Sequence, residues 1–169
     1  DELASAVLVT SCETMATAVQ QQLEVQLVQL SREGIARKSL AAYGAIIVAA
    51  DLEEAIAFSN RIAPEHLELA VADPFAILPK IRHAGAIFMG HHTPEAAGDY
   101  LAGPNHTLPT GGTARFFSPL SVEDFVKKSS IVSFSKAGLE RLGHQIVHIA
   151  ELEGLDAHGR SVSMRLRNC

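Results

Sequence analysis

Short apolar runs alternate with helix-length amphipathic stretches from the start of the chain to residue 90. Four of these runs are predicted to be strands, namely residues 6–10, 45–49, 67–71 and 85–90. The segments that join them are too long for hairpins, so each strand must return to the sheet through a crossover. The alternation therefore predicts an α/β fold with a largely parallel sheet and flanking helices.

Capping signals predict where the helices between these strands begin and end. Asp51 followed by Glu54 three residues later is a capping-box pattern at a helix N-terminus. Three helices are expected: one from the Ser11–Thr14 cap signal to Gly34, one that Asp51 opens and that stops before Pro64, and one from Pro74 to about Arg82. Each of them would connect two predicted strands.

Residues 90–119 interrupt the alternation, because Gly, Pro, Thr, His and Asn dominate there without a sustained period. A segment of this length in a compact domain is typically a functional loop or disordered, and its aromatic residues and histidines favour the loop. Helical periodicity returns over residues 121–127, 135–152 and 156–167. We therefore expect two domains: an α/β domain over residues 1–120, with the functional loop 90–119, and a small helical C-terminal module over residues 121–169.

Composition and charge exclude several classes of function. The 14 basic residues are outnumbered by 19 acidic ones and are not clustered, so nucleic acid is not an expected partner. The longest apolar stretch, residues 41–50, is too short to span a bilayer, so no membrane partner is expected. Two cysteines, Cys12 and Cys169, cannot form a disulfide framework, which favours a cytoplasmic location.

Three places in the sequence hold candidates for catalysis or binding. Glu65 and His66 are adjacent, and a carboxylate beside an imidazole offers two proton-transfer groups; an ordinary polar turn is the alternative. Asp99 and His106 lie in the irregular loop, either as turn residues or as metal ligands or substrate contacts. Near the C-terminus, His158 is expected in the first turn of a helix, where the dipole keeps its ring neutral, as a metal ligand must be.

Several stretches resemble the histidinol dehydrogenase family, in order and with family-like spacing. They are residues 62–69, which contain the motif Pro64-Glu65-His66-Leu67, and residues 85–90, 93–100, 102–110, 112–115 and 155–158. The resemblance covers nearly the whole chain. It implies an enzyme that depends on zinc and NAD. In histidine biosynthesis, such an enzyme oxidises L-histidinol to L-histidine via L-histidinal, with two NAD.

The resemblance also implies roles for individual residues. Glu65 would be the general base that activates water, and His66 the proton-transfer group of the alcohol oxidation. Asp99 and His158 would be zinc ligands. The substrate-binding residues that the resemblance implies are His66, Asp99, His106, Glu153 and His158.

The family's architecture implies a partial Rossmann-like sheet followed by the helical tail. Members are longer than this chain, and their NAD-binding domain and two further zinc ligands lie upstream of the strand at residues 6–10. The chain is therefore expected to be a C-terminal portion of the enzyme, inactive alone, in a homodimer with tail exchange. Two alternatives are a non-catalytic binding module on the same scaffold and one half of a split enzyme.

Overall fold

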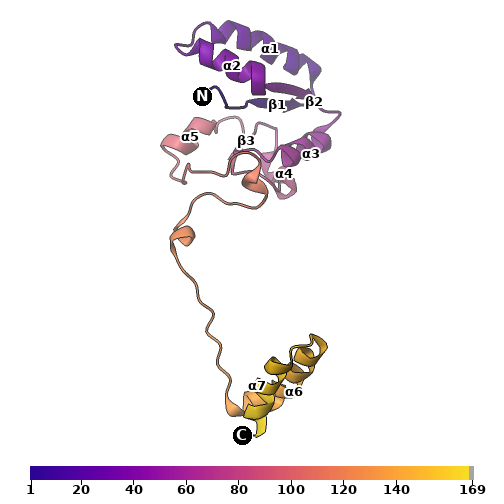
Figure 1. Ribbon diagram of the computed structural model, residues 1–169. Coiled ribbons are helices and arrows are strands. Elements are labelled where there is room, and N and C mark those ends of the chain that lie inside the picture. Colours follow the sequence, from indigo (N-terminus) through magenta and orange to yellow (C-terminus); the bar gives the residue numbers. More distant parts are fainter. Residues whose placement is uncertain (168–169) are drawn as a thin grey trace. The chain divides into compact units, whose positions relative to one another are not determined.

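The computed structural model describes residues 1–167, so Cys169 lies outside the described residues. The chain forms two compact units, one from Asp1 to Phe125 and one from Val126 onwards (Figure 1). The structure divides the chain after Phe125, whereas the sequence analysis places its boundary after residue 120. None of the described helices is long and apolar enough to cross a membrane.

The first unit begins with a pair of parallel strands. Its first elements are β1 (Val7–Thr10), α1 (Glu13–Leu27), α2 (Glu33–Tyr43) and β2 (Ala45–Val48). Val7 of β1 lies opposite Ala45 of β2, and the pairing is parallel, as predicted. Figure 1 shows α1 and α2 together on one side of these strands, and α1 contacts both of them.

Helix α2 is an element that the sequence analysis did not predict. Gly34 was expected to end a helix, but it lies inside α2, and α1 already ends at Leu27. The hydroxyl of Ser39 is part of what holds α2 in place, because it donates a hydrogen bond of 2.7 Å to the carbonyl oxygen of Ala4. This bond joins residues far apart in the sequence, so no local sequence pattern predicts it.

A second pair of parallel strands follows. It comprises α3 (Leu52–Ile62), β3 (His66–Leu69), α4 (Pro74–Ile77), a 3₁₀ turn over Leu78–Lys80 and β4 (Ala86–Met89). The predicted cap of α3 is confirmed, since Asp51 Oδ1 accepts a hydrogen bond of 2.8 Å from the Glu54 amide. The core of this part contains Ile56, Leu69 and Ile77.

The α/β class and the parallel pairing are confirmed, but the strands do not form one continuous sheet in the described chain. β1 pairs with β2, and β3 pairs with β4, as two separate two-stranded sheets. A strand pair this small exposes much of its surface; Ile46 and Val48 of β2 are 37% and 50% exposed. The sheet is therefore partial, as the family resemblance implies.

The remaining elements are helical. Inside the predicted irregular segment lie the short helix α5 (Glu95–Tyr100) and a 3₁₀ turn over Thr113–Arg115, and a single 3₁₀ turn, Val122–Phe125, replaces the helix expected at residues 121–127. The second unit is a hairpin of α6 (Lys136–Leu152) and α7 (Asp156–Arg167), as predicted. Gly143 allows close packing there, because a Cβ at this position would lie 2.8 Å from Leu166 Cδ1.

Candidate active site

Strand β3 presents polar side chains on one face and apolar side chains on the other. Successive residues of a strand point to opposite faces, so His66 and Glu68 share one face while Leu67 and Leu69 face the core. Phe88 on β4 is the register partner of Glu68 and lies on the same face as His66. The rings of His66 and Phe88 are 5.9 Å apart, so the imidazole is supported by an aromatic side chain.

Helix α5 covers this polar face, and two features hold it there. Gly98 permits the close approach, since a Cβ at this position would lie 2.7 Å from the Cε1 atom of Phe88. At the start of the helix, the amide of Glu95 donates a hydrogen bond of 2.7 Å to Glu68 Oε1. Both contacts hold α5 over β3, close to His66, the first residue of that strand.

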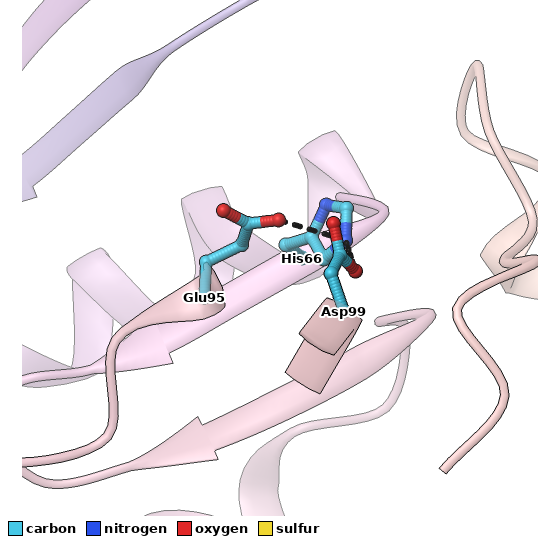
Figure 2. A group of neighbouring side chains, drawn as sticks. All are labelled: His66, Glu95 and Asp99. Carbon is cyan, nitrogen blue, oxygen red and sulfur yellow. Dashed lines mark ion pairs between the residues drawn. The ribbon is translucent and has the colours of Figure 1, made fainter. Parts of the chain in front are cut away.

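The result is a cluster of one imidazole and two carboxylates, His66, Glu95 and Asp99 (Figure 2). Glu95 and Asp99 are four residues apart and therefore lie on the same side of α5. The Nε2 atom of His66 is 3.5 Å from Glu95 Oε1 and 3.8 Å from Asp99 Oδ1. The ligand atoms of the three residues all lie within 4.8 Å of one another.

The imidazole nitrogen of this cluster is buried. Among the described residues, His66 Nε2 has no hydrogen-bond partner, and its two carboxylate neighbours are at ion-pair distance. Burial raises the pKa of Glu95 above its ordinary value, and Asp99 raises this pKa further, while His66 opposes the shift. Imidazole nitrogens and carboxylate oxygens can either bind zinc or exchange protons. The carboxylate of Asp99 therefore fits the metal that the resemblance implies, and the imidazole of His66 fits the proton transfer.

Glu65 sits in a tightly fixed turn beside this cluster but does not belong to it. Ala63, fully buried with a left-handed φ of 52°, ends α3. The carbonyl of Glu65 then accepts a hydrogen bond from the Ala86 amide, 2.8 Å long. Gly85 makes room for that carbonyl, because a Cβ there would lie 2.5 Å from it. The backbone of Glu65 is thus anchored, while its carboxylate is not among the grouped ligand atoms.

The other predicted site residues are more dispersed. His106 is exposed in the loop that follows α5. Glu153 is the C-cap of α6 and His158 lies in the first turn of α7; both are exposed and belong to the second unit. The structure therefore brings together His66 and Asp99 and adds Glu95, which the sequence analysis missed. The four-residue spacing of Glu95 and Asp99 is the signal that points to it.

Comparisons with known proteins agree on one family. The family model described as histidinol dehydrogenase matches residues 1–166. The histidinol dehydrogenases of Syntrophotalea carbinolica and Geobacter sulfurreducens are 73% and 74% identical to the chain over 168 and 167 residues, which is 99% of this chain and 39% of each relative. The crystal structure of histidinol dehydrogenase from Elizabethkingia anophelis superposes with a TM-score of 0.87 at 42% identity, covering 96% of this chain and 37% of that one. The chain thus spans about two fifths of the length of these relatives.

Proposed function

The chain belongs to the histidinol dehydrogenase family, and we propose that it carries part of the catalytic centre that oxidises L-histidinol to L-histidine through L-histidinal in histidine biosynthesis, with two NAD. The observation that carries this proposal is the buried nitrogen of His66, which lies between Glu95 and Asp99 without a hydrogen bond among the described residues. It lies next to Glu65 in the motif that the family shares. Proton transfer is the chemistry that such a pair can perform.

His66 serves the first oxidation. An alcohol can lose hydride only as its hydroxyl proton leaves, so a base must lie beside the hydroxyl group. The Nε2 atom of His66 makes no hydrogen bond within the described part of the chain, which supports its role as the acceptor of this proton. The carboxylates of Glu95 and Asp99, at 3.5 and 3.8 Å, stabilise the imidazolium that forms.

Glu65 serves the second oxidation. An aldehyde must first be hydrated before hydride can leave again, and hydration needs a base that takes a proton from water. The anchored backbone of Glu65 holds its carboxylate at the start of β3, next to His66. One motif thereby supplies separate bases for the two half-reactions.

The remaining residues bind and orient the substrate. Asp99 and His158 would hold zinc, which when bound anchors the imidazole and amine of the substrate, while NAD when bound takes up the hydride. His106 contacts the substrate, and Glu153 pairs with its ammonium group. No NAD-binding residues are assigned to these 169 residues.

We also place this chain in a cytoplasmic homodimer that exchanges its tails. The tail forms a compact unit of its own, which is what an exchanged module requires. The part of this unit that precedes α6 exposes apolar side chains, including Ile131 and Val132 at 93% and 79%. Apolar side chains this exposed favour a protein partner. The cytoplasmic location rests on the scarcity of cysteine, with Cys12 free and exposed.

The test is a chimera in which this chain replaces the matching 168-residue stretch of the Syntrophotalea carbinolica enzyme. We expect the chimera to form NADH from L-histidinol, and His66→Gln to slow it by about 10²–10⁴-fold, the usual contribution of a general base. His83→Gln is the matched control, because His83 is also partly buried but lies outside the cluster. The 169-residue chain alone should form no NADH. An undiminished rate in His66→Gln would refute the assigned role.

A further inference from the structure

Arg115 joins two segments of the first unit that are far apart in the sequence. It is the last residue of the 3₁₀ turn Thr113–Arg115, in the loop that follows His106. Its guanidinium donates a hydrogen bond from Nη2 to the carbonyl oxygen of Arg61 in α3, and a second one of 2.7 Å from Nη1 to the carbonyl oxygen of Gly112. The bond to Arg61 spans 54 residues of sequence, so it ties the loop to the end of α3.

The carbonyl of Arg61 belongs to the part of α3 that needs a partner from outside the helix. α3 ends at Ile62, and the last four carbonyls of a helix have no partner within it. An arginine side chain can donate to such a carbonyl, and its positive charge is favoured at this end of the helix dipole. Arg115 therefore completes the C-terminal end of α3.

The end of α3 leads directly into the motif of the proposed site. Ala63, the left-handed C-cap of α3, stands two residues before Glu65. Glu65 precedes β3, and its carbonyl accepts the hydrogen bond from the Ala86 amide of β4. The backbone of Glu65 is therefore held from two directions: by β4 after the turn and by Arg115, through the end of α3, before it.

The loop that carries Arg115 is itself fixed at its base and at its tip. The amide of Leu120 donates a hydrogen bond of 3.0 Å to the carbonyl of Thr107, which closes the loop at its base. At the tip, Ala114 is buried. Gly112 has a φ of 80°, and a Cβ there would overlap with Nη1 of Arg115, so glycine leaves the space that the guanidinium occupies. Arg115 thus holds α3 from a well-supported loop.

We propose that Arg115 is a positioning residue for Glu65. This inference rests on the proposed role of Glu65 as the base that activates water. With the guanidinium in place, the end of α3 keeps the turn, and with it the Glu65 carboxylate, in the position that this step requires. His66 depends less on Arg115, because the pairing of β3 with β4 and the contact with Phe88 fix it separately. Loss of Arg115 therefore slows the second oxidation more than the first.

Single-turnover kinetics of the chimera with the Syntrophotalea carbinolica enzyme test the proposal. In Arg115→Ala, we expect oxidation of L-histidinal to slow by about tenfold and oxidation of L-histidinol by less than about twofold, since a displacement of about 1 Å at a reacting group can cost about 10²-fold. Equal slowing of both half-reactions would overturn the proposal, because a general loss of folded enzyme affects both alike. Unchanged rates in both would overturn it as well.

Two further variants separate the bridging bonds from the charge. Arg82→Ala is the matched control: Arg82 is exposed and lines, with Arg115, a hollow beside α3, but its side chain makes no hydrogen bond in the described chain. It should leave both rates unchanged. Arg115→Lys keeps the charge but donates from one nitrogen instead of two at a fixed spacing, so it should lose nearly as much rate as Arg115→Ala. Full activity of Arg115→Lys would contradict the bridge.

Hydrogen exchange at the Ala63 amide provides a measurement that does not depend on activity. This amide donates a bond of 2.9 Å to the Ser59 carbonyl in the last turn of α3. In the chimera, we expect it to exchange about threefold faster, or more, in Arg115→Ala than in Arg82→Ala, because the end of α3 opens more easily. Equal exchange in the two variants would refute the positioning role. A chimera with Arg115 that forms no NADH would instead refute the proposed function.

Discussion

At the scale of single residues, two neighbouring side chains divide the proposed chemistry. His66 has a buried nitrogen without a hydrogen bond, and Glu65 has an anchored backbone one residue earlier. The roles of both residues stay predictions, because they depend on substrate atoms. Their difference is testable, since only the second half-reaction consumes water.

Glu65→Gln in the chimera should slow oxidation of L-histidinal by about 10²–10⁴-fold, since the amide cannot accept a proton from water. The rate of oxidation of L-histidinol to the aldehyde should fall much less. Each half-reaction is measured in a single turnover from its own substrate. Glu53→Gln, on an exposed part of α3, controls for the lost charge. Equal losses of rate in both half-reactions would mean that Glu65 and His66 do not act as bases in separate half-reactions.

The second residue-scale prediction concerns the pH dependence of stability. The pKa of Glu95 is raised above its ordinary value of 4.5, chiefly by burial. The folded chain therefore holds this proton more tightly than the unfolded chain. The protonated carboxyl of Glu95 therefore stabilises the folded chain. This contribution is full below the pKa of Glu95 in the unfolded chain and is lost as pH rises through its pKa in the folded chain. Urea unfolding of the metal-free chain should thus show a steeper fall in stability with pH than Glu95→Gln shows. An equal fall of stability with pH in the chain and in Glu95→Gln would contradict a raised pKa of Glu95.

At the scale of elements, helix α5 assembles the cluster through its contact with the second sheet. Gly98→Ala would place a Cβ 2.7 Å from the ring of Phe88 and push α5 outwards. We expect a loss of about 1–3 kcal/mol in the free energy of unfolding, as for other overpacked sites. We also expect a lower zinc content in the chimera, because Asp99, a proposed zinc ligand, lies on α5 and moves with it. Urea unfolding and metal analysis measure the two effects.

A matched glycine and a rescue distinguish this effect from general helix effects. Gly34 of α2 has nothing within 4 Å of an added Cβ, so Gly34→Ala should keep or slightly raise stability and leave the zinc content unchanged. Phe88→Leu shortens the obstructing side chain and should restore part of the zinc content of Gly98→Ala. A fully stable Gly98→Ala variant with normal zinc would show that α5 is not held by this contact.

At the scale of the whole molecule, the proposed zinc ligands lie in different units, Asp99 in the first and His158 in the second. If tails are exchanged, each zinc site takes Asp99 from one subunit and His158 from the other. Chimeras with Asp99→Ala and with His158→Ala should each be inactive. After random subunit exchange, activity should return to about a quarter of wild type, because each heterodimer has one intact site under two-fold symmetry. Proven exchange without recovery would mean that each chain completes its own site.

Local sequence patterns were sufficient for a large part of the fold. The four strands, the helices α6 and α7 and the cap of α3 were predicted because they depend on residues within one or two turns of each other. The motif around Glu65 and His66 identified the family, and the comparisons confirm it. Helix α2 escaped prediction because its buried Ser39 bonds to Ala4, 35 residues away in the sequence.

Short-range periodicity and contiguous motifs are thus sufficient to predict the α/β class, the helical tail and the family. The return of α5 over β3, by which Glu95 and Asp99 meet His66 at the amino end of that strand, is visible only in three dimensions. The same structure shows that the described strands stand as two separate pairs. The physical reason is that both features depend on packing between segments distant in sequence, such as Gly98 against Phe88, whose geometry no local pattern encodes.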